Sequence, residues 1–585
     1  MDCKRTLQNL MACSALVGAC LLIPGTAPAQ SLSDAEKIQK LERQTELLQK
    51  QSELLQRQLK EVKDELARAR QKPERMEASA QSVAASPPAP RRDPKSPIVK
   101  APAAAERIKV TLNGFVTADT VWRQRNQVAD VATPFGAIPF PFSPLYNEHE
   151  FHGSARKSQL QLLFEGNIDS VQKLSGYFET DFLGVGGGPP AASNYTETNS
   201  WPPRLRQAWL TYDNTASGFH FLAGQAWTLA TQNRLGIAPR RENIPNTIEA
   251  SYVVGFDYLR QWQLRAVQDF GPVSLGISIE NPAMIVAAST ATAPTGVGGP
   301  FASGGIINGI EVNFANTAGG GGFTNGVTIT TDQIPDIIEK AAFDPGWGHY
   351  EIFGLQRFFS DNTLTCVPGP CIAGSTAMTG PTTVKTRFGG GVGGSMLLPL
   401  IPNHVDPSAN YLEFTGSILY GRGVGRYATG QLPDVTIAAD GSLTPLVGLS
   451  ALVGLIARPL NGLDIYAYAG IEQVSASYFN SGTALFGYGN PGFSNVGCTI
   501  VTPSSFALAV TAAPANCIGN NRRLSEVTVG FWQDIYRSKP LGRVRVGAQY
   551  EYIRREVFAG IGGAPATDNN IFLTSIRYFL PDVVF

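Results

Sequence analysis

From residue 107 onward the sequence alternates between apolar and polar residues, in segments separated by alternately short and long connections. In residues 542–556, GRVRVGAQYEYIRRE, the valines, the alanine and the tyrosines fall on one face of an extended chain, and the arginines, Gln549 and Glu551 fall on the other. A soluble sheet would turn its polar face to bulk water, whereas a transmembrane barrel encloses that face around a wet interior. Because the pattern recurs over half of the chain with aromatic residues at segment ends, it predicts an all-β transmembrane barrel.

The composition agrees with this fold class. The chain has 61 glycines and 9% aromatic residues, as expected for many strands and turns. Its formal net charge is zero, so the overall balance gives no argument for a nucleic acid partner. After the N-terminus, no stretch approaches the roughly 20 apolar residues of a transmembrane helix.

The N-terminus has the features of an export signal. Lys4 and Arg5 precede an apolar stretch at residues 10–23, and Ala27-Pro28-Ala29 matches a cleavage site. We therefore predict a signal peptide at residues 1–29. An alternative is the lipoprotein-like sequence VGAC at residues 17–20, which would leave Cys20 lipidated.

Export also bears on the cysteines, because disulfides form outside the cytoplasm. Removal of residues 1–29 leaves four cysteines in two local pairs, each in a connection rich in Gly, Pro, Ser and Thr. The simplest of the three pairings joins Cys366 to Cys371 and Cys498 to Cys517.

Residues 32–72 have the heptad pattern of a coiled coil, with no Gly or Pro in that range. The alternative is a single amphipathic helix lying on another surface. The core positions of the predicted coiled coil include Ile38, Leu41, Leu48, Leu55, Leu59, Val62 and Leu66. Residues 73–106 follow as a linker rich in Ala and Pro, and residues 107–585 form the predicted barrel domain.

Fifteen segments read directly as strands, but a single-chain bacterial barrel needs an even number. The alternation of short and long connections fails only between residues 281 and 348. A strand at PDIIEKAAF, residues 335–343, followed by the turn Asp344-Pro345-Gly346, restores it. The repaired count is about sixteen antiparallel strands, and it places both cysteine pairs in long outer connections. The fifteen segments are 107–122, 157–167, 172–183, 204–212, 218–228, 261–270, 273–280, 349–359, 384–397, 411–420, 447–457, 463–472, 526–536, 543–556 and 571–579.

The polar face of each strand would line the lumen. Acidic residues gather on early strands and arginines recur on other strands, so the two signs could face each other across a constriction that orients anions. The alternative is that inward charges only pair with one another. The predicted pore-lining residues are Lys109, Asp119, Glu165, Glu179, Asp181, Arg204, Arg206, Arg265, Arg543, Arg545 and Arg577, with Arg204 and Arg206 on a strand that alternates poorly.

The Gly-rich segment 281–334 has two open interpretations. It either folds inward and narrows the pore or forms part of an outer crown.

Signals of catalysis or metal binding are weak. The chain has no G-x-S-x-G, P-loop or HExxH motif, and His149-Glu150-Phe151-His152 has the wrong spacing for a zinc pair. We expect no enzyme activity and no cofactor or metal.

Eight segments, in order along the chain, resemble the DcaP-like trimeric outer-membrane porins. They are LNGFV (112–116), FETDFLG (178–184), LRQAWLTY (205–212), AGQAWT (223–228), IPDII (334–338), WGHYEIFGLQR (347–357), YGRGVGRY (420–427) and SIRYF (575–579).

The resemblance implies a homotrimer in the outer membrane of a Gram-negative bacterium, in contact with its lipids, with the coiled coil in the periplasm. It implies diffusion of small anionic solutes, dicarboxylates among them, through three separate pores. The chain departs from the family by continuing past the expected last strand as residues 580–585. Rival functions are a structural barrel tethered to peptidoglycan by its coiled coil, and a phosphate- or sugar-selective channel.

Deleting residues 32–72 tests the predicted coiled coil. We expect the trimer to loosen while the barrel stays folded, because the heptad contacts lie outside the strands. Semi-native gel electrophoresis reports both properties, and a deletion variant that still ran as a heat-resistant trimer would contradict the prediction.

Overall fold

The computed structural model describes residues 108–184, 201–287, 304–307, 310–313, 315–317, 328–366, 380–402, 411–481, 484–500 and 517–584. The chain divides into two units, Met1–Val99 and Lys100–Phe585, and all described residues belong to the second. The predicted signal peptide, coiled coil and linker, with Cys20, Cys371 and Phe585, lie outside the described residues.

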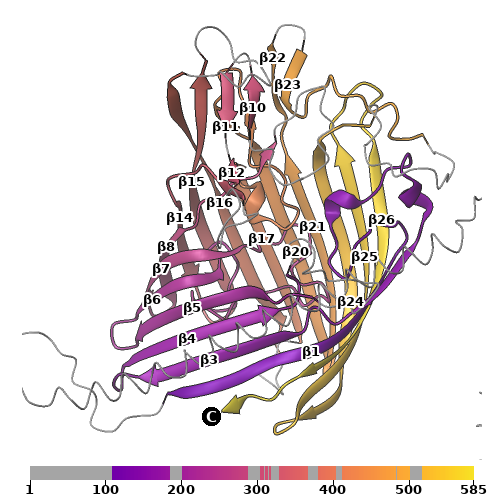
Figure 1. Cartoon of the computed structure of the whole chain (residues 1–585). Helices are drawn as coiled ribbons and strands as arrows, with labels where there is room; N and C mark the ends of the chain where they lie inside the picture. Colours follow the sequence, from indigo (N-terminus) through magenta and orange to yellow (C-terminus); the bar gives the residue numbers. More distant parts are fainter. Residues whose placement is uncertain are drawn as a thin grey trace, which may run out of the picture. The chain divides into compact units, whose positions relative to one another are not determined.

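Sixteen antiparallel strands form one closed barrel (Figure 1). Each strand pairs with the next along the chain, and the last pairs with the first through Phe115–Arg123 and Ile571–Phe579. The strands are β1 (Lys109–Arg123), β3 (Gln159–Asn167), β4 (Gln172–Asp181), β5 (Arg204–Asn214), β6 (Phe219–Trp227), β7 (Arg260–Phe270), β8 (Val273–Glu280), β14 (Asp336–Phe343), β15 (His349–Thr365), β16 (Thr382–Ile401), β17 (Leu412–Arg422), β20 (Val447–Leu460), β21 (Leu463–Val474), β24 (Asn521–Ser538), β25 (Gly542–Val557) and β26 (Ala566–Phe579).

The strand inferred from parity is present. β14 pairs with β8 on one side and β15 on the other, through Phe343 opposite Val273 and Tyr350. The predicted count of sixteen and the position of the missing strand are both confirmed. Among the described residues, no helix is long and apolar enough to cross a bilayer.

The connections at the two ends differ in length, as predicted. Short turns such as 168–171, 271–272 and 461–462 join strands at one end, called the turn end below. Connections such as 228–259 and 475–520 join them at the other, called the loop end.

The segment 281–334 is described only in parts. Its strand β11 (Ile310–Asn313) pairs with Asn362–Thr365 at the loop end of β15, and β10 (Gly304–Ile307) pairs with β11. These pieces extend the wall at the loop end, where Figure 1 shows β10 and β11 beside the upper part of β15. A further piece, β9 (Val286–Ala287), pairs with β18 (Val435–Ile437) of the β17–β20 connection. β10 and β11 therefore fit the crown interpretation, whereas residues 283–287 lie against the inner face of the wall, since Arg357 of β15 donates to Ala283 O and Met284 is buried in a cluster with Phe359.

The two faces of the wall differ as the alternation predicted. Ile352 is 66% exposed on the outside, while its neighbours Glu351 and Phe353 are 6% and 3% exposed on the inside. The exterior is thus apolar, as a bilayer requires, because hydrocarbon offers no partner to polar groups.

A β-bulge explains why the alternation is poor on β5. The register shifts between Glu179, which faces Gln207, and Thr180, which faces Leu205, so Arg206 is the additional residue. Two successive residues of β5, Arg206 and Gln207, consequently make inward contacts with Glu179.

The chain past β26 continues the sheet. β27 (Val583–Val584) pairs with Thr111 and Leu112 of β1, below the β26 pairing. Val583 and Val584 therefore cover the turn-end edge of β1.

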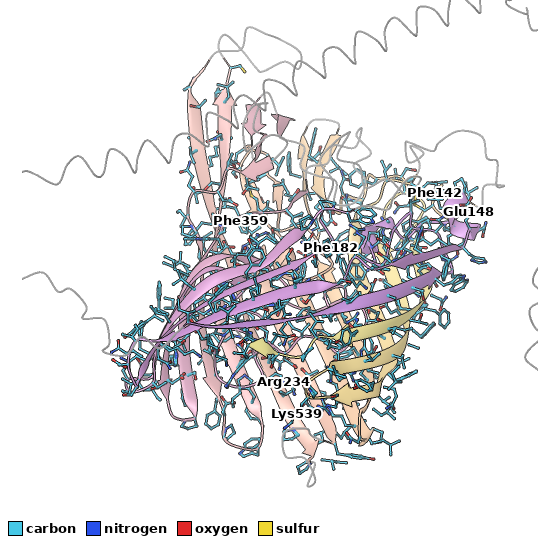
Figure 2. All side chains as sticks on the ribbon, turned by 60° about the horizontal axis from the view of Figure 1, so that its bottom comes forward. Phe142, Glu148, Phe182, Arg234, Phe359 and Lys539 are labelled. Carbon is cyan, nitrogen blue, oxygen red and sulfur yellow. A yellow bond between two sulfur atoms is a disulfide. The ribbon has the colours of Figure 1, made fainter. Side chains whose placement is uncertain are left out.

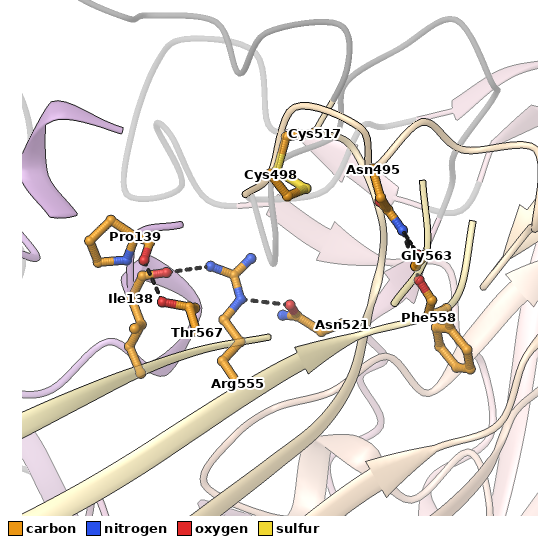
Figure 3. The surroundings of a disulfide bond; sticks show 10 residues. All are labelled: Ile138, Pro139, Asn495, Cys498, Cys517, Asn521, Arg555, Phe558, Gly563 and Thr567. Carbon is orange, nitrogen blue, oxygen red and sulfur yellow. Dashed lines mark hydrogen bonds between the residues drawn. A yellow bond between two sulfur atoms is a disulfide. The ribbon is translucent and has the colours of Figure 1, made fainter. Parts of the chain in front are cut away.

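A disulfide joins Cys498 to Cys517 at the loop end, as predicted. Around it, Arg555 Nη1 donates to Ile138 O at 2.8 Å and Thr567 Oγ1 donates to Pro139 O at 2.6 Å (Figure 3). The connection that follows β1 is thus tied to the ends of β25 and β26 beside the disulfide. Cys366 is also disulfide-bonded, and its partner lies outside the described residues.

Replacing Cys498 and Cys517 together by serine tests the role of this bond. Loop entropy predicts a loss of about 3 kcal/mol for a bridge closing a loop of this order. We expect faster proteolysis within residues 475–520, while heat-modifiable migration on gels shows an intact barrel. An unchanged cleavage rate would contradict this expectation.

Candidate functional site

The connection between β6 and β7, residues 228–259, runs inside the barrel and is called the inner segment below. Its first half reaches the turn end, where Gly236 N donates to Asp344 Oδ2 at 2.9 Å in the β14–β15 turn. On the way Asn233 N donates to Glu351 Oε1 of β15 at 3.0 Å. Arg234 lies toward the same end as Lys539 of the β24–β25 turn (Figure 2).

The second half runs along another part of the wall, where side chains accept hydrogen bonds from its backbone N–H groups. Ile248 N donates to Gln549 Oε1 of β25 at 2.6 Å, and Val254 N donates to Glu526 Oε2 of β24 at 2.8 Å. Gly255 N donates to Glu472 Oε1 of β21 at 2.8 Å. Buried backbone groups need such partners, so the inward polar residues of these strands fix the segment.

Glycines allow the backbone of the inner segment to come into direct contact with the backbones of β20 and β21. A Cβ on Gly470 of β21 would lie 1.7 Å from Val254 O, and a Cβ on Gly255 would lie 2.1 Å from Ala451 O. Gly255 also has a φ of 90°, which favours glycine.

Apolar packing supports the same contacts. Val253, Val254 and Phe256 belong to a buried cluster with inward residues of the wall, including Leu452 and Trp532. The prediction of an interior lined only by polar side chains is therefore corrected, because part of the inner face packs against inward-folded connections.

The predicted pore-lining charges of β4 and β5 form a compact network. Arg204 Nη2 lies 2.7 Å from Asp181 Oδ2, and Arg206 Nη1 lies 2.8 Å from the same oxygen. Arg206 Nε also pairs with Glu179. Arg204 keeps 31% of its side chain exposed, whereas Arg206 is buried.

A second network lies on β21, β24 and β25. Arg545 Nη2 is 2.5 Å from Asp464 Oδ2, and its Nε is 2.8 Å from Asp534 Oδ1. Arg543 Nη1 lies 3.9 Å from Asp534 Oδ2 and stays partly exposed. The structure therefore brings Arg543 and Arg545 together, but each has a carboxylate beside it.

The last predicted wall arginine also contacts the inner segment. Arg577 Nη2 donates to Ile248 O at 2.8 Å and lies 3.8 Å from Asp119 Oδ1. Its Cζ is 4.7 Å from the ring centroid of Trp532.

The remaining predicted residues occupy two separate places. Lys109 Nζ lies 3.5 Å from Glu165 Oε2 near the turn end, and Lys173 pairs with the same carboxylate. Arg265 of β7 is 3% exposed and donates to Gln263 Oε1 at 3.0 Å and Trp227 O at 2.5 Å. Arg265 thus holds the start of the inner segment rather than facing open solvent.

These pairings correct the hypothesis of opposed acidic and basic walls. Glu179 and Asp181 pair with arginines of the adjacent strand, and Asp119 pairs with Arg577, so the wall charges largely neutralise one another. The alternative, inward charges that pair with one another, describes the predicted set better.

Four further arginines were not among the predicted pore-lining residues. Arg240 and Arg241 are exposed in the middle of the inner segment. Arg240 Cζ lies 5.2 Å from the centroid of the inward ring of Tyr177. Arg260 begins β7 with its Cζ 4.7 Å from Trp227, and Arg426 lies in the β17–β20 connection. In the described part of the chain, none of the four forms an ion pair. The signal available in the sequence was the pair Arg240-Arg241 within the polar, Pro-containing stretch APRRENIPN.

Comparison with known proteins identifies similar structures. No protein-family model and no curated protein matches the sequence. The outer membrane channel DcaP of Acinetobacter baumannii is similar over 80% of this chain and 97% of that chain, with 16% identity and a TM-score of 0.49. An anion-selective porin from Comamonas acidovorans is similar over 81% and 100%, with 8% identity and a TM-score of 0.38. Salmonella typhi OmpF is similar over 80% and 97%, with 9% identity and a TM-score of 0.38.

Substituting Gly470 by valine tests the packing of the inner segment. The added side chain meets Val254 O, so overpacking should cost about 1–3 kcal/mol and weaken the Val254–Glu526 hydrogen bond. We expect faster amide exchange at Val254 and Gly255, measured by hydrogen–deuterium exchange.

The matched control is Ala469→Val, one position along β21 and exposed on the outer face. It adds the same kind of side chain without approaching the inner segment. Equal exchange in both variants would refute the packing role of Gly470.

Proposed function

We propose that this chain is an outer-membrane diffusion porin that passes small hydrophilic solutes and prefers anions. The observation that carries the proposal is the uneven distribution of charge inside the barrel. Arg204, Arg206 and Arg545 of the wall have adjacent carboxylates, whereas Arg240, Arg241, Arg260 and Arg426 have no ion pair among the described residues. Their guanidinium charges are therefore not neutralised by an ion pair, and an unneutralised positive charge beside a low-dielectric wall attracts anions.

The course of the inner segment supports a narrowed path beside β3, β4 and β5. The segment forms hydrogen bonds with β15, β21, β24 and β25. Toward β4 its contact is of a different kind, the guanidinium of Arg240 near the ring of Tyr177. Arg204, half-exposed on β5, lies on the same side of the barrel as Tyr177. A solute passing there would meet guanidinium groups from both the wall and the segment.

Dicarboxylates are the solute class that we propose. A guanidinium binds a carboxylate through two parallel N–H groups, and several guanidiniums along one path offer a second carboxylate its own partner. Inward aromatic residues such as Tyr177 and Trp209 are buried against each other, with ring centroids 5.0 Å apart. That arrangement does not offer the open stacking faces of a sugar path.

We further propose a homotrimer held by the coiled coil of residues 32–72 in the periplasm, with the apolar exterior in contact with outer-membrane lipids. Heptads with a wide apolar stripe favour more than two chains. Contact of the coiled coil with peptidoglycan is a separate, additional hypothesis.

Single-channel recording of the purified protein tests the function. We expect ohmic, anion-preferring conductance. In a salt gradient, the reversal potential should shift toward zero when Arg240 and Arg241 are both replaced by glutamine. The reason is that this variant removes two unpaired charges and leaves the wall networks unchanged.

Arg554→Gln is the matched control, since Arg554 is a half-exposed arginine paired with Glu556 on β25. Its reversal potential should match that of the wild type. The absence of conductance would overturn the porin proposal, and equal reversal potentials for the double variant and the wild type would overturn the anion path.

A further inference from the structure

Three buried glutamates gather where the inner segment crosses β24 and β25, and they are called the carboxylate cluster below. Glu249 belongs to the segment, Glu526 to β24 and Glu551 to β25, and they are 1%, 3% and 0% exposed. Thr528 faces Glu551 in the register, so Glu526 and Glu551 are diagonal neighbours on the inner face. The charge of Glu249 acts on both of them.

The hydrogen bonds of the cluster are incomplete. Glu526 accepts from Val254 N at 2.8 Å and from Thr528 Oγ1, and one oxygen of Glu551 accepts from Gln549 Nε2. The other oxygen of Glu551 and both oxygens of Glu249 accept no hydrogen bond in the described part of the chain. Each of these oxygens is buried, and a buried polar atom without a protein partner is costly.

One ammonium group accompanies the three carboxylates. Lys157 Nζ lies 3.5 Å from Glu249 Oε1 and also donates to Ile248 O at 3.4 Å. Neither Glu526 nor Glu551 forms an ion pair among the described residues. The cluster, fully ionised, would hold three negative charges against one positive charge.

The other titratable groups near the cluster do not correct this imbalance. Glu472 of β21 adds a further buried carboxylate that acts on Glu526. Tyr466 of β21 donates its hydroxyl to Gln549. Arg577 of β26 points its guanidinium at Ile248 O and pairs with Asp119. Among the described residues, no group of His, Cys, Asp and Glu is arranged to hold a metal ion.

We propose that the carboxylate cluster is a proton-controlled latch for the inner segment. A proton on one carboxyl group removes a negative charge and supplies an O–H donor to a bare oxygen of its neighbour. The seated segment therefore binds protons that the released segment gives up to solvent. By linkage, low pH favours the seated form, and rising pH releases residues 248–255 from the wall.

Hydrogen–deuterium exchange of the purified full-length protein tests the latch. After correction for intrinsic exchange, the opening equilibrium at the amides of residues 248–255 should rise with pH, by about tenfold per pH unit for each proton released. Replacing Glu249 and Glu551 together by glutamine keeps the shapes and removes both charges. We expect this variant to stay protected, with a weaker pH dependence at these amides, because only Glu526 of the cluster remains ionisable.

Glu242→Gln is the matched control. Glu242 is a carboxylate of the same inner segment, and burial raises its pKa to about 7, but it lies outside the cluster. This variant should keep the wild-type pH dependence at residues 248–255. If the double variant does not yield a heat-modifiable barrel, Glu551→Gln alone serves for the same comparison and should weaken the dependence.

Two outcomes would overturn the latch. One is protection of residues 248–255 in the wild type that does not change with pH. The other is a Gln variant of the cluster that keeps the wild-type dependence. Because amide exchange does not require conduction, failure of the latch is distinguishable from failure of the proposed porin function.

Discussion

The closure of β26 onto β1 is the constraint on which the rest of this structure depends. Inside a bilayer, an unpaired backbone N–H or C=O costs several kcal/mol, so a sheet with an open edge is unstable there. Closure of a single-chain barrel with both ends on one side requires an even number of antiparallel strands. From this follow the alternating connections, the period-two division of side chains, and the enclosure of a polar face that must itself find partners.

The inner face meets that last requirement in two ways. Arginines and carboxylates on adjacent strands neutralise each other, as Arg204 and Arg206 do with Asp181. Elsewhere, wall carboxylates and amides accept backbone N–H groups of the inner segment, as Glu472 and Gln549 do. The same chemistry thus stabilises the wall and fixes the segment that narrows the interior.

The fold could be predicted from the sequence because its signals are local or additive. Period-two alternation defines each strand, and parity placed β14 where the alternation of short and long connections failed. The Cys498–Cys517 bond followed from proximity in the sequence. The inner segment could not be predicted this way, because its contacts join Val254 to Glu526 and Gly255 to Glu472, far apart along the chain. For the long segment 281–334 the sequence left an inward and a crown interpretation open, and the described parts divide between them: β11 pairs with β15 at the loop end, and Met284 is buried against Phe359.

The charge pairing in the candidate site could likewise not be predicted from the sequence. A sequence pattern gives the face of each arginine, but not whether a carboxylate on the next strand neutralises it, because that depends on register. The bulge at Arg206 illustrates the point, since one extra residue turns both Arg206 and Gln207 toward Glu179. Arg240, Arg241 and Arg426 lie on connections and Arg260 lies at a strand end, where no neighbouring register supplies a carboxylate. Arg265, within β7, donates to Gln263 and to Trp227 O instead. The electrostatics of the proposed path therefore depend less on the strands that define the barrel than on the segments folded into it.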